Sequence, residues 1–305
     1  MRRFFDGCRF LLLAAVLGLV PATTSCASTS PKVAVAQPDK PKAKDAHLIA
    51  MRVVGGKVGT MLYMDRIRDR PAAQRILSSG LLGDYLDGTG IDLLRDVQRL
   101  FVASTGVNQE DKAAIVVWHR LPEAELRSKL DALVQREGSG AWLPGLEMPT
   151  AKVVIKGHRR VVAMVAPEYL VVLPETNVKD ASRFAGTGGL PEPEGPEGGL
   201  TTAEEPSKSL RAPNVPNIPD TITKANITIS FGADGSVDLA GDGESLSAEQ
   251  AESDARTMTE RVDKATSIKV AIVRVRLFKP VDFRAEGSHV KTDLHLSASE
   301  LDKLI

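Results

Sequence analysis

Short apolar runs of strand length recur along this chain, and tight turns join many of them. The clearest run is 225–231, where apolar residues alternate with polar ones, so that a strand there has one apolar and one polar face. Asp234-Gly235 then returns the chain into a second apolar run at 237–239, which is the signal of a β-hairpin. Because strands joined by hairpins pair antiparallel, the sequence predicts antiparallel sheets.

Other runs with strand character share β-branched residues and flanking turns, and we expect strands at 48–54, 58–64, 100–102, 113–118, 151–155, 161–165, 169–173, 281–284 and 290–296. The first two of these flank Gly55-Gly56-Lys57, which predicts a hairpin turn. That turn lacks the residues of a phosphate-binding loop.

Helical spacing is clearest at 121–136, where Leu126, Leu130 and Leu133 fall on one face. A second helix follows a Ser cap at 245 or 247 and carries small residues at three- and four-residue steps through 265, which suits packing across a sheet or contact with a coiled-coil partner. Shorter helices are expected after Pro71, at 178–184 and after Ser297. Residues 268–278 fit either a helix or a strand.

These elements predict an α+β fold of antiparallel sheets with helices packed on one face. The pattern divides the chain into two folded regions, 47–185 and 220–305. Between them, residues 186–219 are rich in Pro, Gly and Glu and predict a linker, although 200–210 has enough Thr and Leu to cross a sheet edge.

The N-terminus has the pattern of an export signal. Arg2 and Arg3 precede an apolar run from Phe10 to Val20, and small polar residues lead to Cys26. The apolar run is too short to span a bilayer comfortably. Residues 1–25 are therefore expected to be a signal peptide, and residues 26–46, which are rich in Pro, Lys and Ala, a disordered tether.

The stretch Thr23-Thr24-Ser25-Cys26 resembles the lipobox of bacterial lipoproteins, in which small residues precede a cysteine that becomes a diacylated N-terminus. Thr23 departs from that pattern, where an aliphatic residue is usual. The resemblance implies lipidation of Cys26 and anchoring in a membrane. The alternative is cleavage after Ala27 by ordinary signal peptidase, which releases a soluble periplasmic or secreted protein.

Charge and cysteine content narrow the class of protein further. The two cysteines, Cys8 and Cys26, belong to the N-terminal segment, so the processed body has no disulfide. The chain has 39 Lys and Arg against 39 Asp and Glu, and removal of the signal leaves a slightly acidic body. Such a balance argues against nucleic acid as a partner. An aromatic content of 4% argues against sugar or base stacking, although Trp118 and Trp142 keep a glycan role open.

Candidate chemistry in the body is sparse, and the histidines lack the helical spacing of a zinc pair, so neither a metal nor a cofactor is expected. Asp293 and His295 share the polar face of one expected strand and are candidates for a ligand or acid/base pair. A basic turn suited to anionic headgroups contains Lys156, His158, Arg159 and Arg160. A solvated sheet face for the first group and a solvated hairpin tip for the second are the interpretations that we favour.

Two short motifs are similar to those of uncharacterised predicted bacterial lipoproteins: Gly90-Ile91-Asp92 leading to a strand at Val102, and Asp234-Gly235 followed by a helix at Ser247–Ala251. The resemblance implies an α+β body without a known activity. We therefore expect a membrane-tethered protein of the cell envelope, acting by binding or scaffolding, with an unidentified envelope protein as partner. The alternatives are a periplasmic hydrolase or glycan-acting enzyme using dispersed carboxylates, and a carrier of an apolar ligand.

Overall fold

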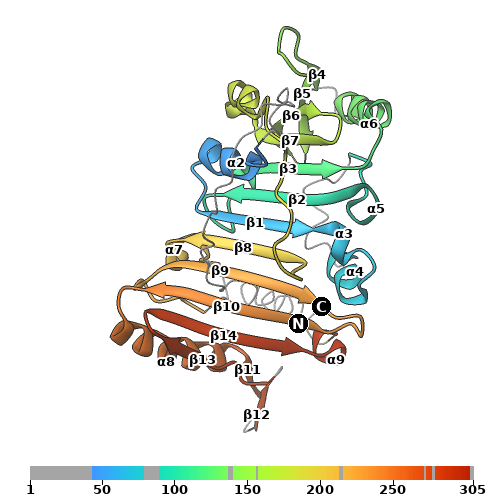
Figure 1. Ribbon diagram of the computed structural model, residues 1–305. Coiled ribbons are helices and arrows are strands. Elements are labelled where there is room, and N and C mark those ends of the chain that lie inside the picture. The colour runs from blue at the N-terminus through green and yellow to red at the C-terminus, as the bar shows by residue number, and fades with distance from the viewer. Residues whose placement is uncertain are drawn as a thin grey trace, which may run out of the picture.

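The computed structural model describes residues 43–78, 89–136, 140–155, 157–212, 216–270, 273–276 and 279–302. One twelve-stranded antiparallel sheet runs through the molecule in the order β13-β14-β10-β9-β8-β1-β2-β3-β7-β6-β5-β4 (Figure 1). The strands are β1 Val58–Tyr63, β2 Val97–Ser104, β3 Ala114–His119, β4 Ala141–Trp142, β5 Thr150–Ile155, β6 His158–Ala166, β7 Tyr169–Pro174, β8 Gly199–Glu204, β9 Ile222–Phe231, β10 Val237–Ser245, β13 Phe283–Glu286 and β14 His289–Leu296. A separate hairpin contains β11 Ser267–Val270 and β12 Val273–Arg276.

The described helices are α2 Ala46–Val54, α3 Met64–Ile67, α4 Pro71–Ser78, α5 Leu93–Asp96, α6 Glu123–Arg136, α7 Pro206–Ser209, α8 Ala248–Ala265 and α9 Ala298–Leu301, with 3-10 helices η2 Glu110–Lys112 and η3 Glu175–Phe184. The mixed α+β class and the antiparallel pairing are confirmed. The helix expected at 121–136 is α6, whose Leu126, Leu130 and Leu133 are buried. The predicted cap Ser247 accepts a hydrogen bond from the Gln250 amide at the start of α8.

Helices cover both faces of the N-terminal half of the sheet, which differs from the expectation of one covered face. One core contains buried residues of α3 and α6. A second core, on the opposite face, contains Ala46 and Ala50 of α2 and Phe184 of η3. The reason lies in the strands: β3 and β7 are continuous apolar runs, buried on both faces, and both faces need a cover.

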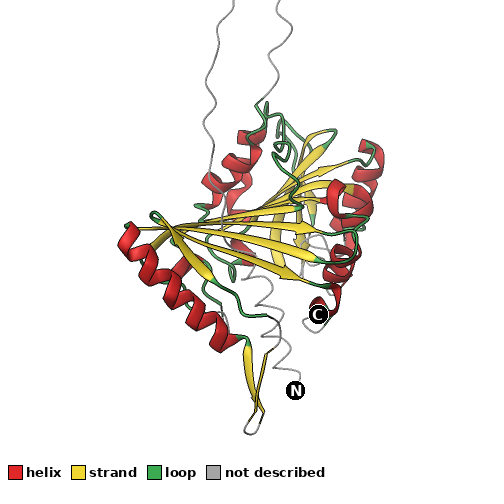
Figure 2. Ribbon diagram, turned by 60° about the horizontal axis from the view of Figure 1, so that its bottom comes forward, coloured by secondary structure: helices red, strands yellow, loops and turns green. Residues whose placement is uncertain are grey.

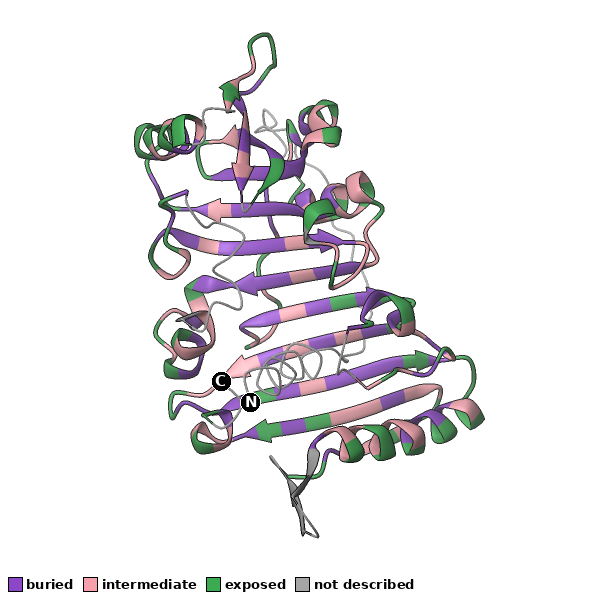
Figure 3. Cartoon of the chain, turned by 180° about the vertical axis from the view of Figure 1, so that it is seen from behind, coloured by how far each residue is buried: buried purple, intermediate pink, exposed green. Residues whose placement is uncertain are grey.

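The strands of the C-terminal half alternate, as the sequence predicts. In β9, Ile227 and Ile229 are buried while Thr228 and Ser230 are only half-buried. The buried side packs against α8 and α9 in two small cores. Figure 3 shows the result, with exposed segments on these strands and nearly continuous burial along β1, β2 and β3.

The division into two regions joined by a linker is not confirmed, because strands of both regions lie in one sheet. Residues 199–204, inside the expected linker, form β8, which pairs with β1 on one side and β9 on the other. A side chain at Gly199 would approach Ile229 within 2.7 Å and Leu62 within 3.0 Å, so its lack of a side chain allows this fit. The Thr60 and Thr201 hydroxyls also lie 3.1 Å apart across the β1–β8 pair.

Residues 48–54 were expected as a strand and are helical instead. In α2, Ala46 and Ala50 lie one turn apart and are completely buried, which is helical rather than strand spacing. Gly55 adopts φ 60°, and the Gly56 amide donates to the Met51 carbonyl over 2.7 Å. The pair Gly55-Gly56 thus ends a helix and does not turn a hairpin.

The segment 268–278, which fits either class from its sequence, is strand in its described residues. β11 and β12 pair antiparallel from Ser267↔Arg276 to Val270↔Val273. β-Branched residues, which favour extended backbone, make up half of these eight positions. The hairpin lies outside the large sheet and projects from the end of the body that carries β13 and α8 (Figures 1 and 2).

Candidate functional site

The candidate site is a polar surface on one face of the C-terminal half of the sheet, which we call the polar face. Cross-strand register aligns its residues in rows, such as Thr228↔Ala240↔Asp293 and Ser230↔Asp238↔His295. The polar face contains Lys224, Asn226, Thr228 and Ser230 of β9, Asp238, Ala240, Asp242 and Glu244 of β10, Arg284 and Glu286 of β13, and His289, Lys291, Asp293 and His295 of β14. Apolar residues of α8 and α9, including Ala251, Ala255 and Leu301, pack against the opposite face of these strands.

Asp293 and His295 both lie on the polar face, as the sequence predicts, but each has a different partner. The Arg284 guanidinium donates to the Asp293 carboxylate over 2.7 Å. The His295 Nδ1 lies 2.7 Å from the Asp238 Oδ1 on the neighbouring strand. Each of the two residues therefore has a partner on a neighbouring strand, which the sequence of β14 alone does not indicate.

The remaining charges of the polar face also pair across strands. Lys291 bridges to Glu286 over 2.7 Å and Lys224 to Glu244 over 3.4 Å. The Lys291 pairing lowers the pKa of the Glu286 carboxyl and raises that of the Lys291 amine. The face is thus a network of alternating charge with a hydrogen-bonding strip along β9.

Asp242 is the polar-face residue that differs from its neighbours, because its side chain is only 3% exposed. Burial raises the pKa of its carboxyl, and the hydrogen-bond contact with the His289 Nδ1 opposes that shift. The His289 side chain is 41% exposed, so this pair connects a buried carboxylate to the surface. Sequence reasoning missed Asp242, since its place in an alternating strand gave no sign of burial.

The basic turn has only part of the surface that the sequence predicts. Arg160 is buried and donates to the Ala113 carbonyl over 2.7 Å, so it is not available to a headgroup. The reason is its position inside β6, between β5 and β7. His158 and Arg159 are exposed, and Arg159 lies 3.6 Å from Glu175. Lys156 lies outside the described residues.

Cys26, the expected lipidation site, also lies outside the described residues, as do the signal segment and most of the expected tether. The last tether residues are described: the Gly188 amide donates to the Ala43 carbonyl over 2.7 Å, and α2 begins at Ala46.

Both tryptophans are engaged with neighbouring side chains. The Trp118 ring stacks on Tyr169 at 6.4 Å, and the Arg99 guanidinium lies 5.2 Å from it. The Trp142 indole donates to Asp131 over 2.7 Å, with the Arg127 guanidinium 4.0 Å from its ring. Each tryptophan ring therefore has an arginine guanidinium over it.

Arg99 holds a segment of the expected linker across the sheet, a role that the sequence did not reveal. Its guanidinium is nearly buried and donates to the Leu190 carbonyl over 3.1 Å and the Pro191 carbonyl over 3.3 Å. It also pairs with Glu192, and hydrogen bonds from Arg99 and Lys44 lower the pKa of that carboxyl. We call residues 188–192 the strap.

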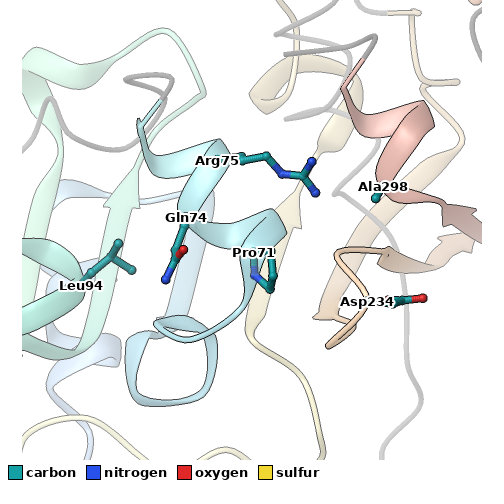
Figure 4. Close-up of a pocket in the computed structure, with 6 residues that line it drawn as sticks. All are labelled: Pro71, Gln74, Arg75, Leu94, Asp234 and Ala298. Atoms are coloured by element: carbon teal, nitrogen blue, oxygen red, sulfur yellow. The ribbon is translucent and has the colours of Figure 1, made fainter.

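A shallow, open depression lies where the two halves of the molecule meet (Figure 4). It is lined by Pro71, Gln74 and Arg75 of α4, Leu94 of α5, Asp234 of the β9–β10 turn and Ala298 of α9. Arg75 is bound on both sides, to Asp302 over 2.6 Å and to the Gly235 carbonyl over 3.3 Å. This arrangement ties α4 to the C-terminal half.

Two features are absent from the described residues. No group of three His, Cys, Asp or Glu side chains there is arranged to hold a metal ion. No helix in the same residues combines the length and apolar character needed to cross a bilayer. Comparison with protein families, with curated proteins and with solved structures finds no match to this chain.

Proposed function

We propose that this chain is an exported protein of the cell envelope, anchored through a lipid on Cys26, and that its body binds a protein partner without catalysis. The proposed export and membrane anchoring rest on the N-terminal sequence, where basic residues and an apolar run precede Cys26. The binding role rests on the polar face. The observation that carries it is that seven residues of this face, distributed over four strands, are exposed, while α8 and α9 pack against the opposite face of these strands.

The charges of the polar face indicate the chemistry of the partner. The polar face has more acidic than basic side chains. Its five carboxylates are Asp238, Asp242, Glu244, Glu286 and Asp293, and its three Lys and Arg residues are Lys224, Arg284 and Lys291. A protein surface with basic side chains and hydrogen-bonding groups complements it. Thr228 and Asn226 supply neutral hydrogen-bonding groups between the charges. Such a partner is favoured over an apolar ligand, because the face presents few apolar atoms.

Export and anchoring are tested by producing the full chain in a bacterial host, separating membrane and soluble fractions, and measuring the intact mass of the product. We expect a membrane-bound product whose mass corresponds to cleavage before Cys26 plus acyl chains. Cys26→Ser is expected to move the protein to the soluble fraction, while Cys8→Ser, the matched control, leaves it with the membranes. A soluble native product beginning at Ser28 contradicts the proposed anchor.

The binding face is tested with a photo-crosslinking residue at Thr228 in the native host envelope. The control position is Glu252, which is exposed on α8 away from the polar face. We expect a discrete adduct from position 228, none from 252, and its loss in the Asp238→Lys, Glu244→Lys double variant, whose melting temperature is checked separately. Equal adducts from both positions, or an adduct that survives charge reversal, contradict the proposed face.

A further inference from the structure

The two halves of the sheet repeat one chain path. In the N-terminal half, β1, β2 and β3 are consecutive neighbours, the long helix α6 follows, and the last strand, β7, returns beside β3 (Figure 1). In the C-terminal half, β8, β9 and β10 are consecutive neighbours, α8 follows, and β14 returns beside β10. The first strands of the two paths, β1 and β8, pair antiparallel with Thr60 opposite Thr201. A two-fold rotation about an axis through this pair, perpendicular to the sheet, therefore relates the two paths.

The long helices of the two halves lie on the same face of the sheet, as such a rotation requires. Leu62, which belongs to the core of α6, is opposite Gly199, and Gly199 is opposite Ile229. Ile229 belongs to the core against which Val262 of α8 packs. Because residues directly opposite each other on neighbouring strands share a face, α6 and α8 are on one side.

A single row of residues shows what lies on the other face. Each residue of the row is opposite the next, from the core of α2 to the polar face: Ala163, Val171, Val116, Phe101, Met61, Leu200, Thr228, Ala240 and Asp293. The first five belong to the core that contains Ala46 and Ala50 of α2, and Leu200 packs against it. The row becomes polar at β9. The polar face is therefore the continuation of the face that α2 and η3 cover in the N-terminal half.

The strands under these two helices correspond to the strands of the polar face. α2 lies across β2 and β3, and η3 packs against β6 and β7. Under the two-fold rotation, β2 and β3 correspond to β9 and β10, and β6 and β7 to β13 and β14. The equivalent positions in the C-terminal half are thus the polar face, of which seven residues are exposed.

The side chains of the polar face determine which helix would fit over β9 and β10. The half-buried residues there are short, which permits close approach: Asn226, Thr228, Ser230 and Ala240. Asp238 and Glu244 are exposed near the two ends of β10. They are ~20 Å apart at the rise of an antiparallel strand, a length that a helix of about 14 residues covers.

The polar face has five carboxylates against three Lys and Arg residues, so it favours a cationic element. Accepting that this face binds a protein, on which the inference rests, we propose that the partner docks through a basic helix. The helix lies over β9 and β10 in the position that α2 has over β2 and β3. Its Lys or Arg side chains point toward Asp238 and Glu244.

The first test places a photo-crosslinking residue at Asn226, Thr228 and Ser230 in turn, in the native host envelope. Mass spectrometry identifies the partner residue that each position captures. We expect captured residues in one segment, separated by three, four, seven or eight positions, because such residues share one face of a helix. Captured residues two positions apart, or in separate segments, overturn the helix and leave the binding face intact. The absence of adducts from all three positions overturns both proposals.

The second test measures the affinity of the full chain for a synthetic peptide of the captured segment. Proline at a central position that is not captured is expected to weaken binding ~100-fold, because it breaks a helix. Proline at the first position of the segment is the control and is expected to change affinity less than threefold, because the first turn of a helix accepts it. A loss of less than threefold from the central proline overturns the proposal.

The third test asks whether the helix lies over β10. Asp238→Asn combined with Glu244→Gln is expected to weaken peptide binding ~tenfold, because two anions that face its cations are lost. The control with the same charge change is Glu249→Gln combined with Glu252→Gln, at exposed positions of α8. It is expected to weaken binding less than twofold. Equal losses in the two double variants overturn the proposed position of the helix.

Discussion

Asp242 shows how one side chain of the polar face links stability to pH. Burial raises its carboxyl pKa in the folded protein, so the folded state holds its proton more tightly than the unfolded chain does. Stability contributed by this group is present below the unfolded pKa and is lost as the pH rises through the folded pKa. At neutral pH the buried charge therefore costs free energy.

Asp242→Asn removes that charge and retains an oxygen that accepts a hydrogen bond from His289. We expect the variant to be more stable than the native protein at pH 7.5 by ~1 kcal/mol, with the difference shrinking toward pH 5. Urea unfolding at both pH values measures it. Asp238→Asn, at an exposed His–Asp pair of the same strand, is the control and is expected to change stability by less than ~0.5 kcal/mol. A less stable Asp242→Asn variant at pH 7.5 contradicts this account.

His119 produces the opposite pH dependence. The residue is 2% exposed, and neither ring nitrogen has a hydrogen-bond partner. Burial lowers the pKa of the imidazole, although the main chain at Leu121 opposes the shift. Since the unfolded histidine takes up a proton more readily, stability is complete above about pH 6.5 and falls as the pH drops toward the folded pKa.

In His119→Leu, the decrease in the free energy of unfolding between pH 7 and pH 5 is expected to be smaller by ~1 kcal/mol. The reason is that the unfolded chain then has no histidine at this position to take up a proton. Thermal unfolding at half-unit pH steps checks this. His158→Gln, an exposed substitution at the start of β6, serves as the control. An unchanged slope in His119→Leu means that other groups cause the acid sensitivity.

At the scale of elements, the strap shows a side chain from one strand organising a segment far away in sequence. Arg99 satisfies the Leu190 and Pro191 carbonyls, and Gly189 lies so close to the Trp118 ring that an added side-chain carbon would come within 2.4 Å. Buried carbonyls and Glu192 would lose a partner together if the guanidinium were removed. The strap is therefore expected to depend on one residue.

Arg99→Met is predicted to destabilise the protein by ~3 kcal/mol and to increase hydrogen exchange in residues 186–192. Arg99→Lys retains the charge without the planar guanidinium, so its stability is expected to lie between those of the native protein and Arg99→Met. Arg183→Gln, which removes an exposed pair with Asp180, serves as control with a loss below ~1 kcal/mol. Unchanged exchange in the strap of Arg99→Met would falsify its assigned role.

Elements with a strong local signal were predictable from sequence, and those decided by their neighbours were not. The spacing of Leu126, Leu130 and Leu133 and the cap at Ser247 indicate α6 and α8 without any tertiary information. In contrast, 48–54 contains apolar residues compatible with either class, and only its docking on the sheet through Ala46 and Ala50 selects a helix. The partners of Asp293 and His295 lie on neighbouring strands, so only the strand register brings these side chains together.

At the scale of the whole molecule, the sequence signal for a linker conflicts with the position of that segment. Pro, Gly and Glu dominate 186–219, yet Gly199, Thr201 and Ala203 are small enough to lie between β1 and β9. A composition of this kind predicts loops because it cannot form a core by itself. Here β1 and β9 supply the apolar surface, and the small residues of β8 fit the limited space between these two strands.

Gly199→Val tests whether β8 couples the two halves. The added carbons meet Ile229 of β9 and Leu62 of β1, so we expect a loss of ~2–3 kcal/mol and faster hydrogen exchange in both neighbouring strands. Thr202→Val, a substitution of similar size on the exposed face of the same strand, controls for the altered sequence and is expected to change stability by less than ~0.5 kcal/mol. If 47–185 and 220–305 were independent domains on a linker, Gly199→Val would leave exchange in β1 and β9 unchanged. Faster exchange in both strands instead means that β8 couples the unfolding of the two halves, because β8 forms hydrogen bonds with β1 of one half and β9 of the other.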